Sequence, residues 1–232
     1  MMTVIVIVVV SGALLIGALW GIYGNLSKRT EGFLVALAGG ALMVSAILEL
    51  IKPALEKTSI HLALLVVLIG AVVFTALDYL VKKKWGSNSG GGLLAAITLD
   101  GIPENLALGV ALIGADPITV AALSGSIFLS NLPEAAGGAK EMAEDDHSKK
   151  KVFFLWAGTA LLLSIAALLG NFLLADVSKD ILSYIRCFAA GAVIASLALE
   201  VFPKAFKEDD YWAGIATAIG VILAFYLNSL GK

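Results

Sequence analysis

Apolar runs of about 20 residues dominate this chain, and they constrain its fold more than any other feature. A run of that length spans the hydrocarbon core of a bilayer as a helix. The charged residues gather in short stretches between the runs. The 232 residues are 59% hydrophobic and 15% charged, whereas soluble domains carry about 25% charged residues. We therefore expect an all-α membrane protein with no segment left over for a soluble domain.

The apolar runs predict eight transmembrane helices in a single domain. Their expected ranges are 4–23, 33–51, 60–81, 93–115, 117–140, 152–174, 181–202 and 212–230. Short connections make successive helices antiparallel neighbours. The first run is expected to be a span and not a cleavable signal, because no basic residues precede it and it is too long for a signal core. The one cysteine, Cys187, excludes an internal disulfide.

The lysines and arginines predict an orientation. The loops after the odd-numbered spans hold eleven of them, and the other loops and both termini hold four. Cytoplasmic loops are enriched in Lys and Arg, so we expect the odd-numbered loops in the cytoplasm and both termini outside. The expected location is the plasma membrane (the inner membrane in a bacterium), with membrane lipids as partners. The formal net charge of −2 gives no indication of nucleic acid binding.

An internal repeat predicts the architecture. Residues 40–49 and 191–200 share Gly, Ala, Ser, Leu and Glu at a constant offset of 151, and Pro53 or Pro203 follows closely. These are the second and seventh predicted spans, which cross in opposite directions, so the repeat is inverted. We expect repeat one over about 1–84, a central helix pair over about 91–140 and repeat two over about 151–232. Such a 3+2+3 inverted repeat is typical of transporters.

The central pair carries two Pro-Glu motifs within apolar runs, at Pro103-Glu104 and Pro133-Glu134. A carboxylate in lipid is costly unless it is paired, solvated or bound to an ion. A proline there also frees a backbone carbonyl, which needs another partner. The simpler interpretation is that each motif only marks the end of a helix. Two such motifs in consecutive spans favour a common site.

Oxygen-bearing side chains surround both motifs at helical spacing. The predicted site is Asp100, Glu104, Ser130, Asn131 and Glu134. Three carboxylates in hydrocarbon would repel one another and take up protons, and a divalent cation removes both problems. By ligand softness, an all-oxygen set suits Mn²⁺, Fe²⁺, Mg²⁺ or Ca²⁺, and Zn²⁺ also accepts carboxylates.

Further polar residues in the apolar runs are candidates for a transport pathway. They are Glu49, Glu200, Ser45, Ser196 and Asn105. For the two glutamates the alternatives are entrance and exit ligands, or interfacial charges paired with Lys52 and Lys204. For the two serines the alternative to a polar path is a hydrogen bond to a carbonyl of their own helix. Asp78 is expected to pair with Lys82 one turn later.

The sequences Asp100-Gly101-Ile102-Pro103-Glu104-Asn105 and Ser130-Asn131-Leu132-Pro133-Glu134-Ala135 resemble the metal-binding motifs of the ZIP family of divalent-metal transporters. The family's fourth span typically contains His-Asn-x-Pro-Glu-Gly. Eight spans, external termini and a three-two-three inverted repeat are also similar to the family's layout. The resemblance implies a multi-pass transporter whose substrate is a divalent ion such as Zn²⁺, Fe²⁺, Mn²⁺ or Cd²⁺. It implies no enzymatic activity, and a homodimer is compatible with it.

The chain departs from the family pattern at the metal-binding positions. Asp100 and Gly101 stand where the family has His and Asn, and the two histidines of the chain, His61 and His147, lie in no motif. The family's carboxylate on the sixth span has no counterpart, since that span offers only Thr159, Ser164 and Asn171. These departures shift the expected preference from zinc toward harder ions or a broad range.

Two other functions stay open at this level. One is transport of a different solute, or cation-coupled secondary transport. The other is a metal-dependent intramembrane enzyme, which lacks support because the chain has no His-Glu-x-x-His and no nucleophile constellation.

Overall fold

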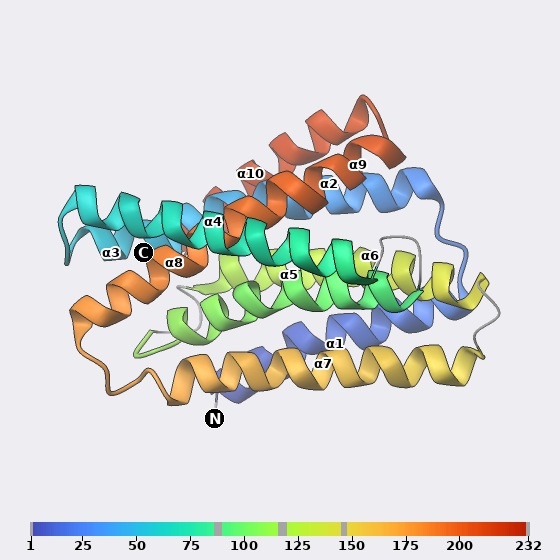
Figure 1. The fold of residues 1–232 in the computed structure, drawn as a ribbon. Helices are drawn as coiled ribbons and strands as arrows, with labels where there is room; N and C mark the ends of the chain where they lie inside the picture. The colour runs from blue at the N-terminus through green and yellow to red at the C-terminus, as the bar shows by residue number, and fades with distance from the viewer. Residues whose placement is uncertain (1, 86–89, 116–119, 145–147, 231–232) are drawn as a thin grey trace.

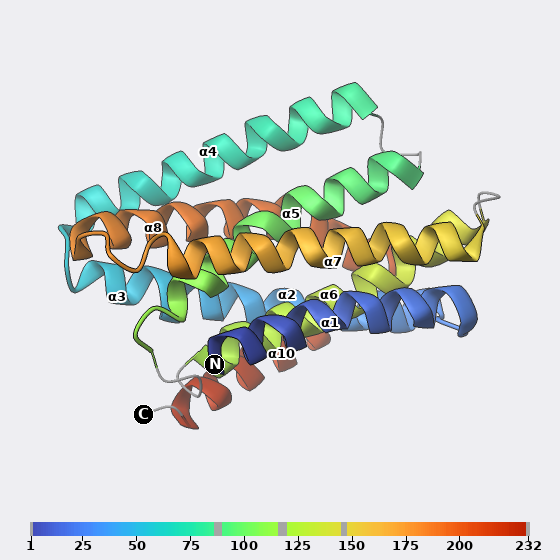
Figure 2. The same ribbon diagram turned by 90° about the horizontal axis from the view of Figure 1, so that it is seen from below.

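The computed structural model describes residues 2–85, 90–115, 120–144 and 148–230, and every long element in these ranges is a helix. The long helices lie side by side in one elongated bundle (Figures 1 and 2). Both termini lie at the same end of this bundle (Figure 1). The described turns between the helices lie at the two ends of the bundle, as expected for a membrane-embedded protein.

Six helical stretches of the described chain are long and apolar enough to cross a membrane. They are Thr3–Tyr23, Lys28–Leu55, Ile60–Lys84, Lys149–Phe172, Lys179–Glu208 and Trp212–Leu230. The protein is therefore an all-α, multi-pass membrane protein, as the hydropathy predicts. Helices α5 (Gly90–Ala111) and α6 (Ala121–Glu144), which carry the Pro-Glu motifs, are not among the six. Eight crossings stay a prediction.

Two of these stretches match each other in their local structure. The first consists of α2 (Lys28–Ser45), the π-helical turn η1 (Ala46–Ile51) and α3 (Lys52–Leu55). The second consists of α8 (Lys179–Ser196), the π-helical turn η3 (Leu197–Val201) and α9 (Phe202–Glu208). Both helix starts and both π-helix starts differ by 151 residues, the offset of the sequence repeat. The two stretches run in opposite directions along the bundle (Figure 1).

Serine caps begin both stretches. Ser27 accepts a hydrogen bond from the Thr30 amide, and Ser178 accepts one from the Ile181 amide. A serine at this position satisfies an amide that the first helical turn leaves without a partner. The caps explain why the helices begin earlier than the predicted starts at 33 and 181, which were placed where the apolar residues begin.

The π-helical turns have a local cause. Each ends just before a proline, Pro53 or Pro203, which has no amide hydrogen to donate to the carbonyl four residues earlier. The preceding amides bond five residues back, Lys52 to Ile47 and Phe202 to Leu197. Single π turns within α-helices are frequent at functional sites. Here they contain Glu49 and Glu200, two of the predicted pathway residues.

The packing joins helices from the two ends of the chain. Helix α2 packs against α10 (Trp212–Leu230), and α8 packs against α4 (Ile60–Trp85). Helix α1 (Met2–Tyr23) lies on α6, and α7 (Lys149–Phe172) lies on α5 (Figure 2). The two expected repeats are therefore interleaved, with each repeat supplying the packing partner of the other.

Glycines allow the closest of these approaches. Gly40 lies against the backbone of Thr217, and Gly191, 151 positions later, lies against the backbone of Val67. A Cβ atom at either glycine would collide with a carbonyl oxygen of the neighbouring helix. Small residues at such crossings let membrane helices gain packing and weak hydrogen bonds.

The other expected ranges agree with the helices to within a few residues. The range 212–230 matches α10, and 60–81 is extended by the basic turn that ends α4 at Trp85. The predicted range 93–115 begins three residues after the start of α5 and ends four residues after its end. The predicted start at 117 lies outside the described residues, as does His147.

Candidate functional site

Helix α5 carries the first Pro-Glu motif in its second half. Glu104 is only 3% exposed, and its carboxylate interacts electrostatically with those of Asp100 and Glu134. Asp100 lies one turn earlier on the same face of α5, as its spacing predicts. The three predicted carboxylates, two from α5 and one from α6, therefore lie within electrostatic range of one another.

Helix α6 supplies the other half of the candidate site. The Ser130 hydroxyl donates to Glu134 Oε1 at 2.5 Å within the same helix. The buried Asn131 donates from Nδ2 to the Val10 carbonyl of α1, with a separation of 3.4 Å. Ser130 thus orients the central carboxylate, whereas the amide group of Asn131 ties α6 to α1.

The three carboxylates do not form a finished coordination shell. In the part of the chain that the structure describes, no group of three or more His, Cys, Asp or Glu side chains is arranged to hold a metal ion. The five proposed ligands stay a prediction. Binding of an ion there would require the carboxylates of α5 and α6 to move closer together.

Asn105 follows Glu104 and is completely buried. Its Nδ2 donates to the Gly101 carbonyl at 2.9 Å, within the turn that contains Pro103. The amide oxygen has no hydrogen-bond partner among the described residues. Asn105 therefore stabilises the proline-containing turn and leaves one buried acceptor unused.

A lysine of α4 lies beside the carboxylates. Lys82 pairs with Asp78 on its own helix at 3.0 Å and also with Glu200 of η3. The Asp78–Lys82 pair was predicted and is confirmed. The expected pairing of Glu200 with Lys204 is wrong, because η3 turns Glu200 toward α4. Asp100 interacts electrostatically with both Glu200 and Asp78, so this ion cluster adjoins the candidate site.

Lys204 has a different partner. It pairs with Glu31 of α2 at 2.8 Å, and both residues interact electrostatically with Glu134. The side chain of Glu31 fits over Gly137 of α6, where a Cβ atom would displace it. Together with Lys82, these residues place a cation on each side of the carboxylates of α5 and α6.

Glu49 of η1 serves as a cap for α6. Its Oε1 accepts a hydrogen bond from the Leu123 amide at 3.2 Å, and Oε2 is buried with no hydrogen-bond partner in the described part of the chain. No ion pair to Lys52 is present among the described residues, so the predicted pairing is wrong. A carboxylate at a helix N-terminus is stabilised by the free amides and the helix dipole. Glu49 also lines a cavity of about 200 Å³ together with Arg186 and Asn228.

The two predicted pathway serines behave differently from each other. Ser45 shares a hydrogen bond with Ser126 of α6, with 3.1 Å between the hydroxyl oxygens. The expected bond to a carbonyl of its own helix is therefore wrong for Ser45. Ser196 is completely buried beside Asp100, without a hydrogen bond of normal geometry in the described structure.

Sequence reasoning missed several residues of this region as site residues: Lys82, Lys204, Glu31 and Ser126. Lys82 was expected only as a partner of Asp78, and Lys204 only as a partner of Glu200. Glu31 resembles an ordinary first-turn acid, which is common in helices. No local pattern indicated any of them, because each meets the site through a residue far away in the chain.

Comparison with known proteins does not place this chain in a family. No family model matches the chain, and no curated protein matches it.

Proposed function

We propose that this protein transports divalent metal ions across the plasma membrane, with the ion as substrate between α5 and α6. The observation that carries the proposal is the electrostatic interaction between Glu104 and Glu134, two carboxylates that each follow a proline inside a helix of a membrane protein. Charged groups at such positions are expensive and usually mark ion pathways. Glu104 and Glu134 are the central ligands, and Asp100, Ser130 and Asn131 complete the shell.

The proposed architecture is eight spans in a 3+2+3 inverted repeat, as in the ZIP family. The matching caps and π turns at an offset of 151 residues, and the opposite directions of the two stretches, support the inverted repeat. Both termini at one end of the bundle agree with an even number of crossings (Figure 1). Interleaved repeats around a central pair suit alternating access, in which one bundle rocks against another around a fixed site.

The decisive experiment is uptake into liposomes that contain the purified protein and a metal-sensitive dye. Zn²⁺, Mn²⁺, Fe²⁺ and Cd²⁺ are tested one at a time. We expect uptake of at least one ion, and we expect Glu104→Ala and Glu104→Gln to abolish it while the protein stays folded. Glu56→Gln is the matched control, since Glu56 is exposed in the turn after α3. Unchanged uptake in both Glu104 variants would disprove the site.

A second candidate is a transporter of another solute that is coupled to a monovalent cation or a proton. The observation that favours it is the ammonium group of Lys82, which already binds Asp78 and Glu200 beside Asp100. A site that accommodates a monovalent cation need not bind a divalent one. Stabilisation of the purified protein by Na⁺, with no effect of any divalent ion, would favour this candidate over metal transport.

A further inference from the structure

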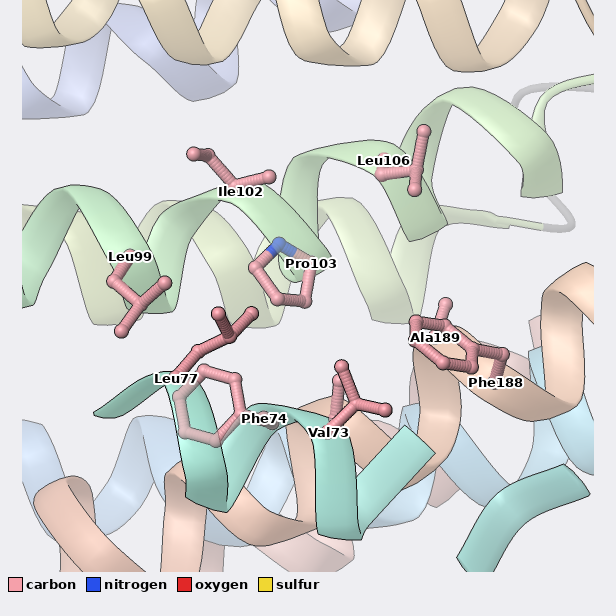
Figure 3. Close-up of a pocket in the computed structure, with 10 residues that line it drawn as sticks. Val73, Phe74, Leu77, Leu99, Ile102, Pro103, Leu106, Phe188 and Ala189 are labelled. Carbon is pink, nitrogen blue, oxygen red and sulfur yellow. The ribbon is translucent and has the colours of Figure 1, made fainter. Parts of the chain in front are cut away.

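Two cavities lie apart from the candidate metal site, since none of its five predicted ligands lines either of them. The first has a volume of about 160 Å³ and lies between α4, α5 and α8. Figure 3 shows the ring of Pro103 turned toward Phe74 and Leu77 of α4 in this cavity, and the other lining residues are also apolar. The second, of about 200 Å³, is lined in part by charged side chains. It therefore offers a ligand charged partners, which the first does not.

Elements from both repeats and from the central pair meet around the second cavity. Glu49 comes from η1, Arg186 from α8, which packs against η1, and Asn228 from α10. The other lining residues are apolar: Leu48, Pro53, Ala111, Ala115 and Val120. A few polar side chains set in an apolar wall are typical of sites that bind small molecules.

The two charged side chains of this cavity have hydrogen-bonding capacity left over. Glu49 is 7% exposed, and its Oε2 has no hydrogen-bond partner among the described residues. Arg186 donates from Nη2 to the Val110 carbonyl at 3.3 Å, whereas its buried Nε has no partner in the same part of the chain. The ion pairs of the described residues include neither side chain. Charged groups inside a membrane protein are costly unless paired, and such groups mark functional sites.

An unused acceptor and an unused donor in one cavity define the ligand that fits it. The Glu49 carboxylate favours a cationic donor, and the Arg186 guanidinium favours a carboxylate, whose planar geometry matches its own. A small zwitterion supplies both groups. A simple acid or a simple amine would leave one of the two protein charges buried and unpaired, which is unfavourable. The apolar wall suits a short hydrocarbon side chain.

We propose that this cavity binds a small apolar α-amino acid. Its α-carboxylate pairs with Arg186, its α-ammonium group pairs with Oε2 of Glu49, and its side chain lies against the apolar wall. The amide group of Asn228 provides a further hydrogen bond. The proposal goes beyond divalent metal transport and does not depend on it, because no residue of the predicted metal site takes part.

Isothermal titration calorimetry of the purified full-length protein in detergent tests the proposal with three molecules of similar size. L-alanine carries both charges, L-lactate lacks the ammonium group, and isopropylamine lacks the carboxylate. We expect saturable binding of L-alanine. The other two should bind at least about tenfold more weakly, since each leaves one charged hydrogen bond unmade.

Matched variants localise the binding. Arg186→Gln and Glu49→Gln each remove one charge and should weaken L-alanine binding at least about tenfold. Arg29→Gln and Glu56→Gln remove like charges at exposed positions outside the cavity and should leave binding unchanged. Arg186→Lys keeps the charge but loses the planar fork, so its affinity should lie between those of the unaltered protein and Arg186→Gln. It replaces the glutamine variant if that variant does not fold.

Three results would overturn the proposal. Absence of saturable L-alanine binding would show that the cavity holds only water or closes by direct pairing of its two charges. Equal binding of L-lactate or isopropylamine would show that a zwitterion is not required. Unchanged L-alanine affinity in folded Arg186→Gln or Glu49→Gln would place the binding elsewhere.

Discussion

The contacts of Lys82 differ from those that its position in the sequence suggests. It ends an apolar run as one of three consecutive lysines, yet its ammonium lies between Asp78 and Glu200. A cation at this position neutralises carboxylates that adjoin Asp100. If a metal ion binds at the proposed site, we therefore expect Lys82 to compete with it for these carboxylates.

Replacing Lys82 by methionine should strengthen divalent cation binding. The variant keeps the length of the side chain and removes the positive charge, so Asp78 and Glu200 lose their counter-charge. For a partly exposed pair the expected gain in affinity is about fivefold. Metal-dependent shifts in the melting temperature of the purified protein measure it. Lys83→Met is the control, and equal affinities in the two variants would exclude a competing role for Lys82.

We expect Glu49 to stabilise the fold through its hydrogen bond with the Leu123 amide. Glu49→Ala removes the acceptor for the Leu123 amide at the start of α6, and caps of this kind are worth about 1 kcal/mol. Glu49→Gln retains an acceptor and should restore most of the stability. Thermal unfolding of the purified variants in detergent tests this expectation. If the glutamine variant is as unstable as the alanine variant, the negative charge and not the hydrogen bond stabilises α6.

At the level of helices, the crossing glycines determine which helices pack together. Gly191 of α8 allows the backbone of α4 to approach at Val67, and Gly40 of α2 does the same for α10. The same residues appear in the sequence as ordinary small residues of an apolar run. The sequence indicates close packing at these glycines, but it does not say which helix is the partner.

Gly191→Ala should therefore destabilise the protein, by about 1–3 kcal/mol, because its methyl group forces α4 and α8 apart. Gly158→Ala is the matched control: Gly158 lies within α7 with no atom near the added carbon. It should leave stability unchanged or increase it by up to about 1 kcal/mol, since alanine is the better helix former. Denaturation of both variants in the same detergent measures the change in stability that each substitution causes. Equal stability would show that the α4–α8 contact is less close than described.

For the whole molecule, the open question is how many times the chain crosses the membrane. Six stretches are apolar enough by length and composition, and α5 and α6 carry the Pro-Glu motifs. If both also cross, the loops at the two ends of the bundle face opposite sides of the membrane. The positions of the loops thus test the inverted repeat directly.

Labelling of single cysteines in intact cells with a membrane-impermeant maleimide measures this topology. Lys57→Cys, Ala115→Cys and Asp176→Cys should react from outside, whereas Lys149→Cys and Lys207→Cys should react only after permeabilisation. Ala115 lies between α5 and α6, so reaction of Ala115→Cys only after permeabilisation would show that these two helices do not cross. The native Cys187 is buried and gives a low background. Reaction of Lys57→Cys and Asp176→Cys on opposite sides of the membrane would refute the antiparallel order between them.

Local chemistry made much of the fold predictable. Hydropathy over about 20 residues identifies membrane helices, because the bilayer selects each segment by its own apolar surface. The 151-residue offset of the sequence repeat is also the offset of the two π turns, and the prolines explain these turns, since a missing amide acts on its own turn. The clustering of Asp100, Glu104 and Glu134 followed from helical spacing and the adjacency of α5 and α6.

The partners that polar residues find on other helices were decided by tertiary structure alone. Glu49 accepts a hydrogen bond from the amide of Leu123, 74 residues further along the chain, and Lys82 and Lys204 bind acids on helices that no local pattern relates to them. The cavity beside Pro103 is lined by residues of three helices that are distant in the sequence. A side chain's neighbours depend on how helices cross, and the crossings depend on packing between segments distant in sequence. Apolar length and spacing therefore predicted the membrane helices and the acidic motifs, and packing determined which charges those motifs meet.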